Sequence, residues 1–189
     1  MRIIFIAISS ILALISPLIY ARAILRGEAR PHRTTRLVLF LITALTTLSL
    51  FAQHDRVAIW LAGASFIQAF VIFVLSLRYG MGGWAKTDIL CLVIALAGIV
   101  LWQTTANPAL GLYAAILADF TGMIPALIKT YHQPETEIAS FYALDVLAAL
   151  FSLLALSIWV PQGFAYPLYI LIINTCMVML VVRPRRPRE

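Results

Sequence analysis

The chain has 189 residues, of which 62% are hydrophobic and only 12% are charged, and its mean hydropathy is +0.97. A soluble domain carries roughly a quarter charged residues, so this composition excludes a water-soluble globular fold and indicates a membrane protein. The formal net charge is +6, so the positions of the basic residues should carry information about topology.

Charged residues and Pro or Gly breaks divide the chain into apolar runs of about the length needed to cross a bilayer core of about 30 Å. In chain order these runs cover residues 3–21, 37–53, 57–77, 88–103, 108–128, 138–159 and 164–182. A backbone exposed to lipid must satisfy its own hydrogen bonds, so each run is expected to form a helix. The predicted fold is therefore all-α and polytopic, with seven transmembrane helices.

The first apolar run raises the question of a signal peptide, because Ala21-Arg22-Ala23 has the small-x-small form of a cleavage site. The run before it is longer than the roughly 7–15 residues of a signal core. Cleavage would also release the arginine-rich segment that follows to the outside, against the charge bias of the chain. The first helix is therefore expected to stay in the mature protein.

The basic residues set the orientation of the predicted helices. Arg2 and Arg56 fall on one side of the membrane, and the other twelve fall on the opposite side: Arg22, Arg26, Arg30, Arg33, Arg36, Arg78, Lys86, Lys129, Arg183, Arg185, Arg186 and Arg188. By the positive-inside rule the N-terminus lies outside and the C-terminus in the cytoplasm. The membrane is expected to be the bacterial inner membrane. The basic tail is expected to contact anionic lipid, with no nucleic-acid partner.

An internal repeat relates the first predicted helix to the fifth. Each runs from the outside inward, with Pro17 opposite Pro125, Arg22 opposite Lys129, and a turn a few residues later. A proline removes one hydrogen bond of its helix and introduces a kink. Both prolines are therefore candidate hinges.

The third and seventh predicted helices correspond as well, because Gln68 falls opposite Asn174 at an offset of 106 residues, against 108 for the prolines. One helix between two three-helix repeats keeps the repeats parallel, which gives a 3+1+3 plan. The expected parts are a first three-helix bundle, a loop with a linker helix, a second three-helix bundle and a basic cytoplasmic tail, at 1–78, 79–106, 107–183 and 184–189.

This plan resembles the PQ-loop or SWEET-like superfamily of parallel-repeat membrane proteins. Pro125, Lys129 and Tyr131, with a turn just after them, are similar to the family's loop motif, so Lys129 and Tyr131 are expected in a cytoplasmic loop motif. Leu18 and Ala126 stand where the motif has a glutamine, as in a divergent bacterial-type member. The family's stacking tryptophans have no counterpart in the second and sixth helices, which argues against a sugar substrate. The resemblance implies a carrier that works by alternating access.

Two carboxylates lie inside predicted helices, Asp119 in the fifth and Asp145 in the sixth. A carboxylate within a span is costly and usually faces the bundle interior or water. Helical spacing places Asp145 on one face with Ala148, Ala149 and Ser152, and it places Asp119 beside a stripe of small residues. Both are candidates for proton coupling, and the alternative is that each only fixes the packing of its helix.

Gln68 and Asn174 are candidate substrate-binding residues, because transporter sites lie near the midplane at the interface of repeats. The alternative is that these amides only join helices. The cysteines lie inside apolar runs and the histidines lie in loops, without the spacing of metal ligands, so neither a metal nor a cofactor is expected. The segment YGMGGW has no strand before it and no Lys-Ser/Thr after it, which favours a flexible loop over a phosphate-binding one.

Three classes of function remain open. The preferred one is a carrier of a small polar solute, with or without proton coupling. The second is a receptor or assembly factor on the same fold, which a long basic cavity would favour. The third is an intramembrane aspartyl hydrolase with Asp119 and Asp145 as its dyad, although the Gly-x-Gly-Asp context of such enzymes is absent. We expect no enzyme, and we expect the lipid bilayer and a small-molecule solute as partners, with small-residue faces that could also serve a homo-oligomer.

Overall fold

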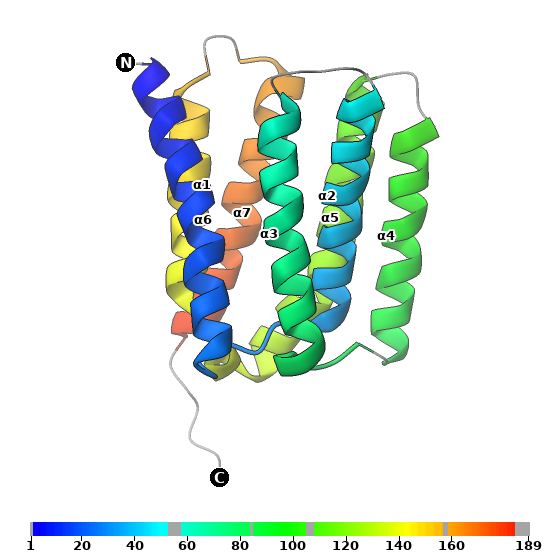
Figure 1. Ribbon diagram of the computed structural model, residues 1–189, viewed down its shortest axis with the longest axis vertical. Coiled ribbons are helices and arrows are strands. Elements are labelled where there is room, and N and C mark those ends of the chain that lie inside the picture. The colour runs from blue at the N-terminus through cyan, green and yellow to red at the C-terminus, as the bar shows by residue number, and fades with distance from the viewer. Residues whose placement is uncertain (1, 53–57, 84, 105–107, 157–158, 184–189) are drawn as a thin grey trace. The chain divides into compact units, whose positions relative to one another are not determined.

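The computed structural model describes residues 2–52, 58–83, 85–104, 108–156 and 159–183, and the chain is all-α (Figure 1). Within these residues it forms seven α-helices and one short 3₁₀-helix: α1 (Arg2–Leu25), α2 (Arg33–Ala52), α3 (Ala58–Tyr79), α4 (Lys86–Thr104), α5 (Pro108–His132), η1 (Pro134–Thr136), α6 (Ala139–Leu154) and α7 (Pro161–Val182). The prediction of seven helices is confirmed. The basic tail expected at 184–189 lies outside the described residues.

Two helices in the described part of the chain are long and apolar enough to cross a membrane, judged by length and composition. These are α1 and the Phe164–Val182 part of α7. Shorter apolar segments occur at Phe66–Tyr79 in α3 and at Ala139–Leu154 in α6. The seven membrane spans and their orientation stay a prediction.

The chain divides into two compact units. Unit 1 consists of Met1–Ala29 and Leu127–Glu189, so it contains α1, the last turns of α5, η1, α6 and α7. Unit 2 consists of Arg30–Ala126 and contains α2, α3, α4 and most of α5. Each unit is a group of helices that pack on one another within that unit. The expected 3+1+3 division rests instead on the internal repeat, and it stays a prediction.

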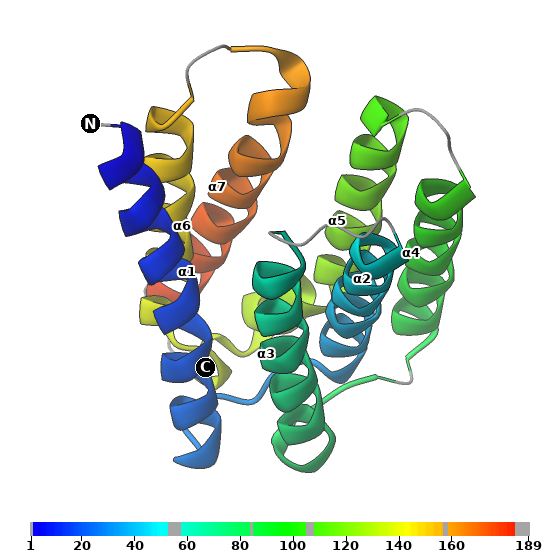
Figure 2. The same cartoon turned by 45° about the horizontal axis from the view of Figure 1, so that its top comes forward.

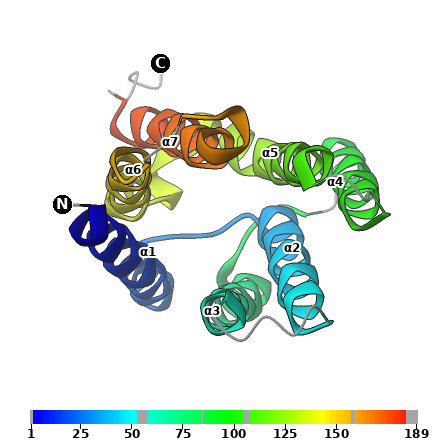
Figure 3. The ribbon, with the colours of Figure 1, turned by 90° about the horizontal axis from the view of Figure 1, so that it is seen from above.

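In unit 1, α6 lies between α1 and α7 and packs along both (Figure 2, Figure 3). The backbone conformation of a glycine ends α1. Gly27 has a φ of +76°, its N–H donates to the Ile24 carbonyl, and the N–H of Glu28 donates to the Ala23 carbonyl at 2.9 Å. This is a Schellman ending, which requires the left-handed backbone that glycine adopts without strain.

In unit 2, α2 packs against α3 and α4. The ring of Phe40 on α2 stacks on Phe73 of α3, with centroids 5.3 Å apart. The small residues expected on the fifth helix allow close packing of α5. A Cβ added at Gly122 would lie 2.5 Å from Val38 Cγ1 of α2, and one added at Gly98 of α4 would lie 3.1 Å from the Ala118 Cβ. These glycines therefore set the distance between the helices.

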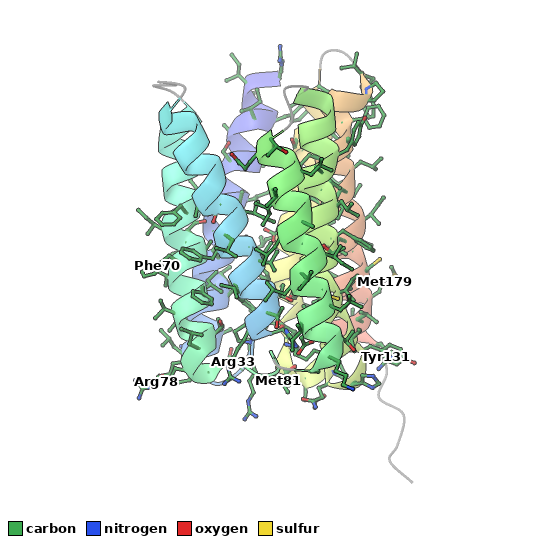
Figure 4. All side chains as sticks on the ribbon, turned by 90° about the vertical axis from the view of Figure 1, so that its right-hand side faces the viewer. Arg33, Phe70, Arg78, Met81, Tyr131 and Met179 are labelled. Atoms are coloured by element: carbon green, nitrogen blue, oxygen red, sulfur yellow. The ribbon has the colours of Figure 1, made fainter. Side chains whose placement is uncertain are left out.

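The connection from α3 to α4 is packed against the start of α2, although the sequence predicts a flexible loop there. The N–H of Met81 donates to the Pro31 carbonyl at 3.0 Å, and the N–H of Arg33 donates to the Met81 carbonyl at 3.1 Å. Arg33 and Met81 accordingly lie at the same end of unit 2 (Figure 4). A Cβ added at Gly80 would lie 2.6 Å from the Pro31 carbonyl oxygen, so only glycine fits at this position.

Candidate functional site

Unit 1 contains a pocket of about 290 Å³ between α1, α6 and α7. Ligand pockets usually measure roughly 300–1,000 Å³, so this one suits a small solute. Its walls are mainly apolar, with a few polar groups from each of the three helices. The lining residues are Ser9, Ala13, Asp145, Ala148, Ala149, Ser152, Tyr166, Pro167, Ile170 and Asn174.

Small residues and prolines make room for this pocket. Ala13 of α1 and Ala148 and Ala149 of α6 line it, and these small side chains leave space that larger ones would fill. Pro17 has no N–H, so the carbonyl of Ala13 lacks its usual helical donor. Pro167 has the same effect one turn earlier in α7 and itself lines the pocket. Of the two residues whose carbonyls lack the usual helical donor, Ala13 is the one that lines the pocket.

Asp145 is the one carboxylate among the residues that line the pocket. The hydroxyl of Ser16 on α1 donates to Asp145 Oδ1 at 2.5 Å, and Ser16 is fully buried. The prediction that Asp145, Ala148, Ala149 and Ser152 share one helix face is confirmed, because all four line the same pocket. A carboxylate held by a donor from a second helix can accept further hydrogen bonds from a solute.

Asn174 of α7 lines the pocket together with Asp145. Its Nδ2 donates to the Ile170 carbonyl one turn earlier at 2.9 Å. A primary amide has a second N–H and a carbonyl oxygen, so this bond leaves capacity for a ligand. The structure thus brings together one candidate for proton coupling and one candidate for substrate binding, and their roles stay predictions.

The other candidate residues lie elsewhere. Gln68 is half-buried on α3, and Asp119 is buried on α5, both in unit 2. Pro17 lies inside α1 in unit 1, and Pro125 lies inside α5 in unit 2. Both helices continue through their prolines, α1 to Leu25 and α5 to His132, and the predicted function of the two prolines as hinges stays a prediction.

Lys129 and Tyr131, expected in a cytoplasmic loop, belong instead to the last turn of α5, which continues to His132. Tyr131 is exposed. Its carbonyl accepts a hydrogen bond from Arg183 at the end of α7, and the Arg183 guanidinium carbon lies 4.4 Å from the centre of the Tyr131 ring. Arg183 therefore ties the end of α7 to the end of α5.

Lys129 takes part in a buried charge cluster. Its ammonium pairs with Glu137 Oε1, and the side chains are only 5% and 1% exposed. The hydroxyls of Tyr20 on α1 and Tyr142 on α6 both donate to Glu137 Oε2, at 2.8 and 3.0 Å. The ring of Tyr20 stacks on Phe141 with centroids 4.3 Å apart. Buried charges persist when they are paired and hydrogen-bonded; here Lys129 is paired with Glu137, and both carboxylate oxygens of Glu137 accept a hydrogen bond.

Little in the sequence indicated a role for Ser16, Tyr20, Glu137 or Tyr142. The bond between Tyr20 and Glu137 joins residues 117 positions apart, and the bond between Ser16 and Asp145 joins residues 129 apart. One local signal was available. Glu137 stands eight residues after Lys129, just before an apolar helix, where a carboxylate needs a partner.

Comparisons of the chain with models of protein families, with curated proteins and with solved structures found no match. The functional interpretation therefore depends on the pocket of unit 1, on its polar residues and on the pattern of the sequence.

Proposed function

We propose that the chain is an integral membrane carrier that moves a small polar solute across the bacterial inner membrane by alternating access. The observation that carries this proposal is the pocket of unit 1, which is lined by both Asp145 and Asn174 among mainly apolar residues. Solute sites of carriers are small, mainly apolar cavities with a few convergent polar groups between helices. Proton coupling through Asp145 is part of the proposal, and Asp119 is the second candidate for that role.

Exposed apolar side chains support the membrane location. Ile67, Val100, Leu154 and Met179 are each more than half exposed on α3, α4, α6 and α7. Met179 and the ring of Phe70 both point outward (Figure 4). Lipid solvates such side chains, whereas contiguous apolar surface of this kind in water leads to association. With the charge pattern of the loops, this supports seven spans with the N-terminus outside and the C-terminus in the cytoplasm.

The sequence pattern supports a carrier of the PQ-loop or SWEET-like kind. The internal repeat and the 3+1+3 plan resemble that superfamily. A receptor was expected to have a long basic cavity. The pocket of unit 1 has no Lys, Arg or His among its lining residues, which favours the carrier over the receptor.

The chemistry of the pocket explains how solute and proton could be linked. An ionised Asp145 is an acceptor only, and a protonated Asp145 becomes a donor. A solute that donates to the carboxylate therefore binds one protonation state better than the other. The walls of the pocket are mainly apolar, and the lower local dielectric strengthens this preference. Binding and release of a proton at Asp145 would then accompany movement of the solute.

The topology makes a labelling prediction. Single cysteines at Val160 and Glu135, in a chain whose Cys91 and Cys176 are replaced by alanine, should be labelled from opposite faces because they fall on opposite sides of the predicted arrangement. In intact cells, an impermeant maleimide should react at position 160 and should reach position 135 only after permeabilisation. The reverse pattern, or a mature chain that starts near Ile24, would contradict the proposed topology and the retention of α1.

The role of Asn174 can be tested once a solute is found by a thermal-shift screen of sugars, amino acids, amines and organic acids at two pH values. Asn174→Leu should weaken solute binding about 5- to 150-fold, since one lost ligand hydrogen bond amounts to about 1–3 kcal/mol. Thr175→Val is the matched control. Thr175 also bonds to its own helix, to the Leu171 carbonyl at 2.6 Å, but it is not among the residues that line the pocket.

Isothermal titration and uptake into proteoliposomes should agree on the difference between the two variants. Equal affinity in Asn174→Leu and the parent protein, with lowered stability, would instead assign the amide to helix packing. A purified protein that neither binds nor moves any of the screened solutes would argue against the carrier.

A further inference from the structure

One face of α1 carries three hydroxyl groups that donate to α6 or to the segment just before it. Ser9 donates to the Ala148 carbonyl at 2.8 Å, Ser16 to Asp145, and Tyr20 to Glu137. The spacings of seven and four residues keep these side chains on one stripe of the helix. Ala13 lies on the same stripe and lines the pocket. The face of α1 that forms the pocket wall is thus the face that is fastened to α6.

Pro17 divides this face into two parts. The turn before Pro17 lacks one backbone hydrogen bond, because proline cannot donate to the Ala13 carbonyl. Kinks and hinges in helices occur at such positions. A hinge at Pro17 would let the segment after it, which contains Tyr20, move while the pocket-lining segment before it stays on α6.

The contacts of Glu137 make it a fixed anchor for that moving segment. Lys129 and Tyr142 are eight and five residues away in sequence, so their contacts with Glu137 hold the α5–α6 connection together. Among the described polar contacts of Glu137, the one from Tyr20 comes from a distant segment, 117 residues away. Tyr20 is completely buried and its ring stacks on Phe141 of α6.

We infer that Tyr20 is a positioning residue that latches the inner half of α1 onto Glu137 and thereby closes the inner end of the unit 1 pocket. This inference rests on the proposed function, because the orientation of the pocket in the membrane and the alternation of access are both parts of that proposal. Breaking the hydrogen bond between Tyr20 and Glu137 lets the segment after Pro17 swing away and opens the pocket to the cytoplasm. Loops and helix ends that gate a site work in this way, through a few contacts that are made in only one state.

The test uses a cysteine at Ala149, which lines the pocket, in the full chain with Cys91 and Cys176 replaced by alanine. Inside-out vesicles expose the inner face to the impermeant reagent methanethiosulfonate ethyltrimethylammonium, and intact cells expose the outer face. Tyr20→Phe removes the latch but keeps the ring and its stacking on Phe141. Tyr142→Phe is the matched control, because it removes a hydrogen bond of similar length to the same oxygen without releasing α1.

Tyr20→Phe should raise the labelling rate in inside-out vesicles about tenfold, as the loss of one hydrogen bond to a charged group implies, and it should not raise the rate in intact cells. Tyr142→Phe should leave both rates within about twofold of the parent. Equal increases in the two variants, or an increase from both faces in Tyr20→Phe, would show general loosening and would overturn the latch. Thermal unfolding of both variants checks that they are folded to the same extent.

The labelling needs no solute, so the latch and the carrier can fail separately. If Tyr20→Phe opens the pocket selectively but the parent protein moves no solute, the result would support the latch and contradict the proposed carrier function. Uptake by the parent protein with unchanged labelling in Tyr20→Phe would keep the carrier and overturn the latch.

Discussion

Lys129→Met is expected to lower the free energy of unfolding by about 3–5 kcal/mol, which is the usual effect of removing one partner from a buried ion pair. The Glu137 carboxylate would stay buried, with its side chain 1% exposed, and would lose the positive charge beside Oε1. The hydroxyls of Tyr20 and Tyr142 would still donate to Oε2, but a hydrogen bond does not supply the missing charge. Unfolding in mixed detergent micelles with increasing SDS, followed by tryptophan fluorescence, measures the change.

Two further variants show whether burial of the charge is the cause. Arg183→Met removes a cation at the surface, where its hydrogen bond to the Tyr131 carbonyl is exposed, so the loss should be about 0–1 kcal/mol. The double variant Lys129→Met and Glu137→Gln removes both charges and keeps an amide oxygen that accepts from the two tyrosines. It should lose less stability than Lys129→Met alone. Equal losses for the Lys129 and Arg183 variants, or additive losses in the double variant, would contradict the buried-pair account.

The existence and approximate position of each helix could be predicted, because a run of about 20 mainly apolar residues indicates a helix. All seven apolar runs correspond to helices in the described part of the chain. The ends could not be predicted as well. The fifth helix continues past the apolar run to His132 and includes Lys129, whose charge is paired with Glu137, and the sixth ends at Leu154 although the apolar run continues to 159. Helix ends follow caps and tertiary partners, which hydropathy does not contain.

The part of the candidate site on α6 could be predicted from the sequence, because it depends on the local periodicity of one helix. Helical periodicity placed Asp145 on one face with Ala148, Ala149 and Ser152, and that face lines the pocket. Periodicity cannot identify which helices complete the pocket. The hydroxyls of Ser9 and Ser16 come from α1, more than 120 residues away, and only the packing of α1 on α6 brings them to the site.

Gly80→Ala is expected to have the second large effect, at about 3 kcal/mol or more, near the upper end for overpacked positions. A Cβ at residue 80 would lie 2.2 Å from the Ser76 carbonyl oxygen and 2.6 Å from that of Pro31. Both atoms belong to the backbone, so no side-chain rotation relieves the contact. The hydrogen bond from the Met81 N–H to the Pro31 carbonyl, which joins the end of α3 to the start of α2, would be lost as the chain moves apart.

Gly27→Ala separates this clash from the conformational effect of losing a glycine. Gly27 has a φ of +76°, but no atom lies within 4 Å of an added Cβ, so the variant should lose only about 1 kcal/mol from backbone strain. The same SDS unfolding assay compares the two variants. If Gly80→Ala lost no more stability than Gly27→Ala, the connection between α3 and α4 would have room to adjust, and the close approach of residue 80 to Pro31 would not hold the end of α3 to the start of α2. A larger loss of stability at residue 80 would instead show that the connection between α3 and α4 is a fixed junction of unit 2, although its sequence predicts a flexible loop. The reason is that its packing depends on the absence of a side chain at residue 80.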